Sequence, residues 1–312
     1  MYKEKLAILT DFLGDSYVSG SEHLFFCPHC GHHKKKLSVN ISKDKFKCGV
    51  CDYRGSSIRR LVRKYGNYSH QKSWAKYIPD IDISKFDEMF RASFGDDDEV
   101  EQKVDLPSQY KPLATATASL AAKPALKYLQ NRGVSREDIL KWKMGYCISG
   151  EYEGRIIIPS FSEAGDVNYF IGRSYQNSWK KYMNPPIGRN IVFNELYVDW
   201  QSDLSIVEGA FDAVVAGNAV PILGSSLRQD SRLIRNIVEN DTPVYVALDP
   251  DAEKKAINLI KKLLMFDIEL YKVDIRPYAD VGEMSKKEYQ LRKNKATLMT
   301  SESILLKAIA TI

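Results

Sequence analysis

Two cysteine pairs near the start of the chain, Cys27-Pro28-His29-Cys30 and Cys48-Gly49-Val50-Cys51, decide how its first part folds. Seventeen residues, 31–47, separate the pairs. Cys-x-x-Cys turns at this spacing are typical of zinc ribbons, because each turn points two thiolates at one ion and four thiolates complete a closed tetrahedron. We therefore expect a structural Zn²⁺ bound by Cys27, Cys30, Cys48 and Cys51.

The segment around these pairs has the pattern of a small β domain. Residues 37–41 and 45–48 alternate apolar and polar side chains, as half-buried strands do, and residues 57–65 place apolar side chains at helical spacing. Two alternatives stay open: nearby histidines act as ligands, or the four thiols bind no metal. The histidines are His29, His32 and His33. The fifth cysteine, Cys147, stands alone and is expected in a core.

The same segment holds most of the positive charge. The whole chain has 45 Lys and Arg against 40 Asp and Glu, a net charge of +5. Between residues 27 and 72, twelve Lys or Arg oppose two Asp, a net of 12 − 2 = +10. Aromatic residues lie among them, and basic faces with aromatics are typical of nucleic-acid binding. The aromatics expected to stack on bases are Phe46, Tyr53 and Tyr65, and the expected basic contacts include Lys35, Lys45 and Arg59. The alternative is a solvated lysine face.

Acidic residues follow the expected strands of the second half. Glu208 follows residues 205–207, Asp249 and Asp251 follow residues 244–248, and Asp280 comes after residues 270–275. Strand and helix patterns alternate from 205 to 275, which predicts a parallel α/β sheet whose carboxyl ends meet at one edge. Clustered carboxylates repel unless cations neutralise them, and oxygen ligands favour Mg²⁺ or Mn²⁺. Singly, each acid is equally well explained by a turn or a helix N-cap.

Several motifs resemble one family. Glu208-Gly209-Ala210-Phe211-Asp212, followed by Asp249-Pro250-Asp251, resembles the TOPRIM domain shared by bacterial-type primases, type IA and II topoisomerases and RecR-like repair proteins. Further segments resemble the DnaG-type primases in particular, namely 125–145, 154–159, Gly172-Arg173, 181–185 and 221–227. The zinc motif resembles that of the same primases, with Cys30 where the common form has histidine. The resemblance covers about residues 27–65 and 123–285.

The resemblance implies synthesis of short RNA primers on a single-stranded DNA template from ribonucleoside triphosphates. It implies that Glu208, Asp249 and Asp251 hold the catalytic Mg²⁺ or Mn²⁺, with Asp280 as a further acidic partner. The residues implied to line the template or nucleotide side are Arg155, Arg173, Lys181 and Asn184. Pro250 stands where the family has glycine, which makes that loop stiffer.

The resemblance also predicts the division of the chain. We expect a zinc-ribbon DNA-binding domain over 1–70, a linker over 71–112, and the N-terminal subdomain of a primase core over 113–200. A parallel α/β TOPRIM subdomain is expected over 201–285 and a helical tail over 286–312. The expected fold class is therefore α/β, with a small β domain at the N-terminus.

The remaining expectations concern context. No signal-peptide pattern and no apolar stretch of membrane-spanning length occur, which favours the cytoplasm and no membrane partner. The sequence has no Gly-x-x-x-x-Gly-Lys-Ser/Thr phosphate loop, so we expect a phage or mobile-element primase with a separate replicative helicase. Two alternatives stay open: a non-catalytic RecR-like DNA-binding protein and a TOPRIM nuclease.

Overall fold

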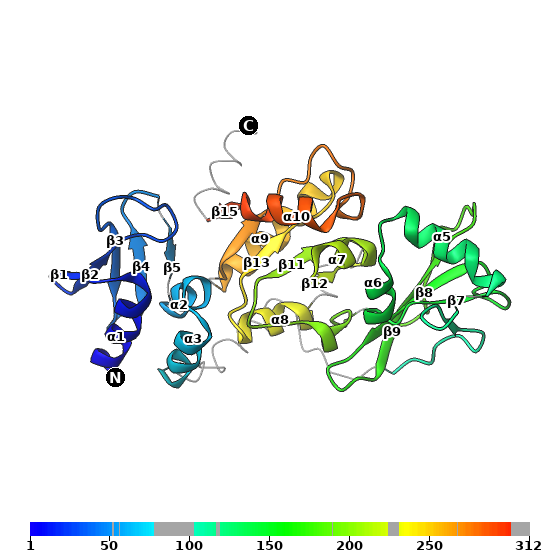
Figure 1. Ribbon diagram of the computed structural model, residues 1–312, viewed down its shortest axis with the longest axis horizontal. Coiled ribbons are helices and arrows are strands. Elements are labelled where there is room, and N and C mark those ends of the chain that lie inside the picture. Colours follow the sequence, from blue (N-terminus) through cyan, green and yellow to red (C-terminus); the bar gives the residue numbers. More distant parts are fainter. Residues whose placement is uncertain are drawn as a thin grey trace. The chain divides into compact units, whose positions relative to one another are not determined.

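The chain folds into two compact units, Met1–Ser84 and Lys85–Ile312, and each is described by itself (Figure 1). The computed structural model describes residues 1–51, 53–55, 57–77, 103–116, 119–188, 190–223, 231–266 and 268–300. Most of the expected linker and residues 301–312 of the expected tail lie outside these ranges. No helix in the described part of the chain has the length and apolar character needed to cross a membrane.

The first unit is a five-stranded antiparallel sheet with helices before and after it. The strands lie side by side in chain order: β1 (Tyr17–Ser19), β2 (Glu22–Phe25), β3 (Leu37–Asn40), β4 (Lys45–Cys48) and β5 (Arg54–Gly55). The helices are α1 (Tyr2–Leu13), α2 (Arg59–Tyr65), α3 (Tyr68–Trp74) and the 3₁₀ turn η1 (Ala75–Tyr77). The small β domain expected from the cysteine spacing is confirmed.

Alternation along β4 shows why this sheet forms. Phe46 and Cys48 are buried, whereas Lys45 and Lys47 are exposed, because successive side chains of a strand point to opposite faces. The buried residues join one core with apolar residues of all three helices, such as Leu9 of α1. The cysteine motif therefore packs on a hydrophobic core to which α1, ahead of the first cysteine, also contributes.

An antiparallel sheet opens the second unit. Its order is β10-β9-β8-β7-β6, and its strands are β6 (Lys111–Pro112), β7 (Gly145–Cys147), β8 (Arg155–Phe161), β9 (Val167–Ser174) and β10 (Tyr182–Met183). The segments η2 (Leu120–Ala122), α5 (Lys123–Asn131) and α6 (Arg136–Lys141) precede β7. Ile156 and Ile158 join one core cluster, whereas Ile157 joins another with Cys147. Both faces of β8 are thus covered, and Cys147 is a core residue as expected.

The second sheet of this unit has the order β12-β11-β13-β14-β15. The strands are β11 (Leu204–Val207), β12 (Ala219–Pro221), β13 (Val244–Val246), β14 (Leu270–Lys272) and β15 (Thr297–Met299). Its helices are α7 (Ala210–Ala216), α8 (Ser231–Glu239), α9 (Glu253–Met265) and α10 (Lys286–Asn294), with 3₁₀ turns η3 (Glu195–Tyr197), η4 (Pro250–Ala252) and η5 (Val281–Glu283). The first four strands pair in parallel, which confirms the predicted parallel α/β sheet.

The C-terminal segment corrects one expectation. The predicted helical tail is helical over α10, but Thr297–Met299 forms β15, antiparallel to β14. Met299 is buried at 4% exposure in the core between the sheet and α8 and α9. Pairing with β15 satisfies the backbone hydrogen-bonding groups at the edge of β14 and buries Met299. The segment therefore forms a strand and does not continue the helix.

Candidate functional site

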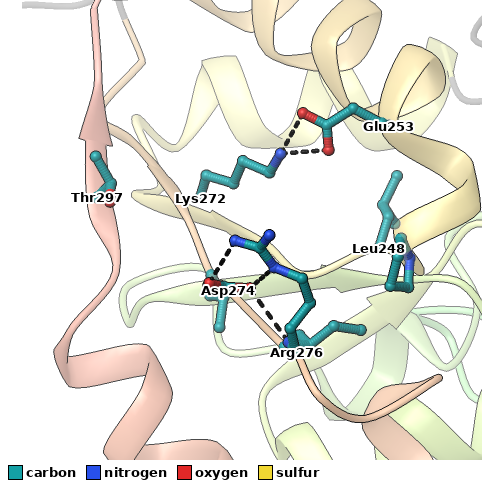
Figure 2. Close-up of a pocket in the computed structure, with 9 residues that line it drawn as sticks. Leu248, Glu253, Lys272, Asp274, Arg276 and Thr297 are labelled. Atoms are coloured by element: carbon teal, nitrogen blue, oxygen red, sulfur yellow. Dashed lines mark hydrogen bonds and ion pairs between the residues drawn. The ribbon is translucent and has the colours of Figure 1, made fainter.

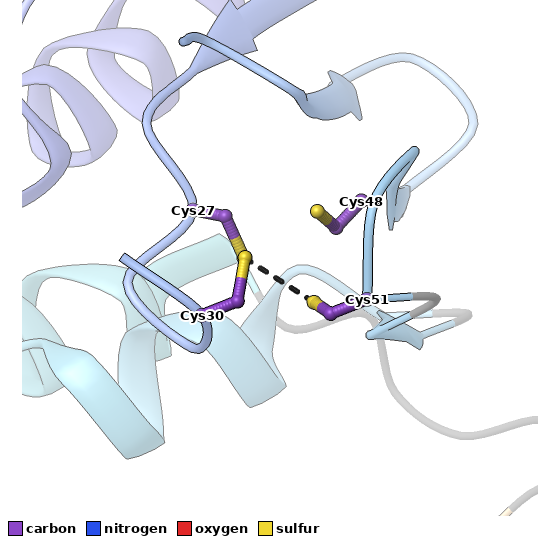
Figure 3. Close-up of side chains that lie close together, drawn as sticks. All are labelled: Cys27, Cys30, Cys48 and Cys51. Carbon is purple, nitrogen blue, oxygen red and sulfur yellow. Dashed lines mark hydrogen bonds between the residues drawn. The ribbon is translucent and has the colours of Figure 1, made fainter. Parts of the chain in front are cut away.

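Four thiols converge in the first unit (Figure 3). One potential ligand atom from each of Cys27, Cys30, Cys48 and Cys51 lies within 4.8 Å of the others, and the Cys27 and Cys51 sulfurs are 3.8 Å apart. A tetrahedron with Zn–S distances of ~2.3 Å has edges of about 3.8 Å. The set therefore fits a structural Zn²⁺. Burial raises the pKa of Cys51 to about 12, and a coordinated metal is what keeps such a thiol deprotonated.

The histidine alternative is not supported. His29 stacks on Tyr53 at 4.6 Å between ring centroids, and its Nδ1 lies 3.0 Å from the hydroxyl of Tyr65. His32 and His33 stack on each other at 4.4 Å. Among the described residues, the metal-binding group contains cysteines alone.

The aromatic contacts expected in the zinc unit need correction. Phe46 and Tyr53 are 3% and 1% exposed and belong to the core, so neither can stack on a base. Tyr65 packs against the same core. The expected basic residues lie nearer the surface: Lys45 is exposed and Arg59 half-buried. Half-buried Lys35 places its Nζ over the ring of Phe26, 5.3 Å from the centroid.

Carboxylates from separate segments influence one another at the end of the parallel strands. Glu208 directly follows β11 and Asp249 lies just beyond β13. Burial, together with the charges of Glu208, Asp212, Asp280 and Asp251, raises the pKa of Asp249 to about 7. Burial also raises the pKa of Glu208, and the charge of Asp251 adds to this. The predicted acids therefore form one electrostatic cluster, in which Asp251 is the exposed member.

Asp212 belongs to this cluster and was missed as a site residue. It is 6% exposed and accepts hydrogen bonds from the backbone N–H of Gly209 (2.7 Å) and of Gly282 (2.8 Å). Burial raises its pKa to about 6. The available signal was the spacing Gly209-x-x-Asp212 at a helix start, since a carboxylate at the third helical position caps the backbone. Asp212 thus ties the loop carrying Asp280 to the segment carrying Glu208.

Two unpartnered oxygens test whether a cation fits here. Asp249 Oδ1 and Asp280 Oδ1 are buried and have no hydrogen-bond partner. Buried acceptors without a donor, beside carboxylates that repel each other, suit a divalent cation. Among the described residues, only the four cysteines gather three or more potential ligands within 4.8 Å. The acids therefore suit Mg²⁺, which keeps several of its waters and needs few protein ligands. They do not form the closed set of ligands that a fully enclosed ion requires.

The predicted cationic residues come from the antiparallel sheet and have different surroundings. Arg155 is 7% exposed and donates to the carbonyls of Lys180 (3.0 Å), Lys181 (3.4 Å) and Gly172 (3.4 Å). This geometry makes Arg155 a positioning residue for the chain that carries Lys181. The Lys181 side chain is exposed. Asn184 is half-buried, and its Oδ1 has no hydrogen-bond partner.

Arg173 and Arg132 both contact Tyr128, and Arg132 is a second residue that was missed as a site residue. Arg173 Nε and Arg132 Nε each lie 2.8 Å from the hydroxyl oxygen of Tyr128, to which both donate. The Arg132 guanidinium also lies 4.9 Å from the ring centroid of Phe211, on α7 beside the acidic cluster. Arg132 follows α5 directly, where its sequence context, Asn131-Arg132-Gly133, indicates only the end of a helix. The Arg132 guanidinium therefore lies against α7, the helix that carries Asp212, and Tyr128 links it to Arg173.

A cavity of about 440 Å³ lies beside the strand ends (Figure 2). Its lining includes Leu248 and Pro250, the chain neighbours of Asp249, but none of the predicted site residues. The lining also includes Lys272, which pairs with Glu253, and Arg276, which pairs with Asp274 at 2.9 Å. The hydrogen bond from Arg276 holds the pKa of Asp274 at about 2. The charged groups of this cavity neutralise one another, so it carries no functional assignment.

Sequence comparisons find similarity to DNA primases. No family model matches the chain. A DNA primase of Thermotoga maritima is 22% identical over 245 residues, which cover 72% of this chain and 42% of the relative. A DNA primase of Clostridium acetobutylicum is 23% identical over an alignment of 321 positions, which covers 82% of this chain and 50% of the relative. The chain thus spans about half the length of these curated relatives.

Solved structures show the same fold. The zinc-binding and RNA polymerase domains of Aquifex aeolicus primase match with a TM-score of 0.50 at 20% identity, covering 95% of this chain and 84% of that one. A DnaG primase catalytic domain bound to single-stranded DNA matches with a TM-score of 0.53 at 19% identity, covering 64% and 78%. The chain therefore resembles the DnaG-type DNA primases and has the fold of those two domains, a small antiparallel sheet with four clustered cysteines followed by a mixed α/β unit.

Proposed function

We propose that this chain is a DNA primase, which synthesises short RNA primers on single-stranded DNA by metal-dependent nucleotidyl transfer. The observation that carries the proposal is the coupling of Glu208, Asp249 and Asp280 across three separate segments. Their mutual repulsion, with the pKa of Asp249 raised to about 7, suits a site that gains its cations together with a nucleotide.

Each side of the site has its own task. Glu208, Asp249 and Asp251 would hold Mg²⁺ or Mn²⁺, which supplies charge stabilisation for the attacking and leaving oxygens of phosphoryl transfer. Asp280 adds a further carboxylate, held in place through the Asp212–Gly282 hydrogen bond. The cationic side, Arg132, Arg173, Lys181 and the adjoining Asn184, faces template or nucleotide phosphates, which charged side chains bind strongly.

The zinc unit completes the proposal as a DNA-binding module. Lys35, Lys45 and Arg59 contact the template phosphates there, and the four-cysteine site keeps the sheet that carries them folded. We further propose that ribonucleoside triphosphates are the substrates and that a separate replicative helicase acts with this chain in phage or mobile-element replication. The substrates rest on the sequence resemblance, and the helicase and the replication context rest on the lack of a phosphate-loop motif in this sequence.

A priming assay tests the proposal. The purified chain is mixed with single-stranded DNA, Mg²⁺ or Mn²⁺ and labelled ribonucleotides, and the products are sized on a gel. We expect short RNA oligomers from the wild type and none from Glu208→Gln or Asp249→Asn. Glu163→Gln serves as the matched control, because Glu163 is an exposed acid in the turn between β8 and β9, outside the acidic cluster.

Two other outcomes identify the alternative functions. Shortening of the template instead of synthesis would indicate a TOPRIM nuclease. DNA binding without any product, even after a replicative helicase is added, would indicate a RecR-like binding protein and would overturn the primase proposal.

A further inference from the structure

The loop between β9 and β10 presents an unusually exposed tryptophan. Trp179 is 95% exposed, more than any other large apolar side chain that the structure describes. The other three tryptophans are covered: Trp74 and Trp142 are 3% and 5% exposed, and Trp200 is half-buried. Large aromatic side chains are normally packed because their burial is strongly favourable. An indole held fully in solvent therefore suits a contact with a partner.

The backbone on both sides of Trp179 is anchored. The buried Arg155 guanidinium donates to the carbonyls of Lys180 and Lys181, immediately after the tryptophan. Before it, the hydroxyl of Ser174 donates to the carbonyl of Gln176 at 3.1 Å, and the Ser174 N–H donates to the carbonyl of Lys181 at 3.0 Å. The loop is thus closed by hydrogen bonds at its base, so the indole is displayed from a fixed support.

Positive charge and a second aromatic accompany this indole. Lys180 and Lys181 are both exposed. Tyr182, 45% exposed, opposes Arg173 across the strands, and the guanidinium lies 4.6 Å from its ring centroid. Single-stranded nucleic acids are bound by this combination, in which aromatic rings stack on bases and cations meet the phosphates. One isolated ring among cations is too small an apolar surface for a protein interface core.

We propose that Trp179 stacks on an unpaired nucleobase while Lys180 and Lys181 meet the neighbouring phosphates of the same strand. The bound partner is a single-stranded nucleic acid, and its identity as template DNA rests on the proposed function. A base pair inside a duplex does not offer its face, so the contribution of Trp179 is confined to single strands.

Binding measurements on the full chain test this proposal. Anisotropy of labelled oligo(dT) and oligo(rU) of about 20 nucleotides, and of a DNA duplex, gives affinities for the wild type, Trp179→Ala and Trp179→Phe. We expect Trp179→Ala to weaken single-strand binding about 5- to 100-fold and to leave duplex binding unchanged. The Phe variant keeps most of the affinity. Leu120→Ala, which removes another highly exposed side chain (77%), leaves binding unchanged.

Tryptophan fluorescence supplies a direct readout of stacking. Oligonucleotide binding quenches the wild-type emission, and we expect most of that quenching to vanish in Trp179→Phe although the oligonucleotide still binds. Wild-type affinity in Trp179→Ala, an equal loss on duplex, or undiminished quenching in Trp179→Phe would each overturn the proposal. A preference for oligo(dT) or for oligo(rU) assigns the strand as DNA or RNA.

The two proposals fail in different ways. Trp179-dependent binding by a chain that makes no primers overturns the primase function and leaves this inference standing. Primer synthesis by a chain whose single-strand affinity is independent of Trp179 overturns this inference and leaves the primase function standing.

Discussion

Asp212 accepts a 2.8 Å hydrogen bond from the backbone N–H of Gly282, a residue 70 positions later in the chain. The bond joins the helix that follows Glu208 to the turn that follows Asp280. A Cβ at Gly282 would stand 2.9 Å from Asp212 Oδ1 and 3.2 Å from Asp280 Oδ1, so this position has no room for a side chain. The geometry of the acidic cluster thus depends on one glycine.

The first prediction concerns that glycine. Gly282→Ala forces Asp212 and Asp280 apart, and we expect it to lower the free energy of unfolding by about 1–3 kcal/mol. Primer synthesis falls about 10- to 100-fold, because small displacements of reacting groups are costly. Thermal unfolding and the priming assay measure the two effects. A variant with wild-type stability and rate would show that the close approach has no consequence.

The second prediction concerns pH and metal. Asp249 and Asp212 have folded-state pKa values of about 7 and 6, above their ordinary value of 3.8. The folded chain therefore holds these protons more tightly than the unfolded chain. In metal-free protein this contribution to stability is present at low pH and is lost as pH rises to about 7. Because Mg²⁺ replaces the protons, we expect it to raise the Tm more at about pH 8 than at about pH 5.

Thermal unfolding across this pH range, with and without Mg²⁺, measures the effect. Asp249→Asn is the control, since it removes the main titrating group and one ligand oxygen. We expect both the pH slope and the Mg²⁺ shift to shrink in it. An Mg²⁺ effect that is independent of pH, or unchanged in Asp249→Asn, would contradict the cation site.

The third prediction concerns the zinc unit. Cys48→Ser removes a buried ligand, and a structural zinc site contributes its binding energy to folding. We expect elemental analysis to find about one zinc per chain in the wild type and little in the variant, with the first unit becoming sensitive to protease while the second stays resistant. Cys147→Ala, a change in the core of the second unit, keeps the zinc. Full zinc content in Cys48→Ser would refute the assignment of this ligand.

The fourth prediction concerns DNA affinity and salt. Each basic side chain that meets a single-strand phosphate contributes about 0.7 to the slope of log affinity against log salt. Replacing Lys35, Lys45 and Arg59 by Ala together should reduce that slope by about 2 and weaken binding most at low salt. Anisotropy titrations at several NaCl concentrations measure the slopes. Equal salt slopes for the wild type and the triple variant would show that these residues do not contact the DNA.

The correct parts of the sequence prediction rest on strong local patterns. Cys-x-x-Cys spacing has few structural solutions, and an apolar run such as 244–248 suits a strand covered on both faces. The residues at strand ends could be grouped because parallel strands share one edge. Asp212 and Arg132 were missed because a helix start and a helix end explain them locally. Their second contacts, with Gly282 and Tyr128, are tertiary and leave no trace in the local sequence.

Two expectations failed for different reasons. Phe46 was expected to stack on bases because it lies among lysines, although the alternation along 45–48 already placed it on the face opposite them. Thr297–Met299 was included in a helix because its three residues are too few to show a period. Pairing with β14 decides its conformation, and such pairing depends on a neighbour that lies 25 or more residues away in the chain.

The alternation in β4 also limits how natural variants of this domain can change in length. The strand carries exposed Lys45 and Lys47 on one side and the thiol of Cys48 on the other. Inserting or deleting one residue between Lys45 and Cys48 would reverse both faces, turning a lysine toward the core and displacing the zinc ligand. The strand can therefore vary by substitution, whereas a change in its length would disrupt both of its faces.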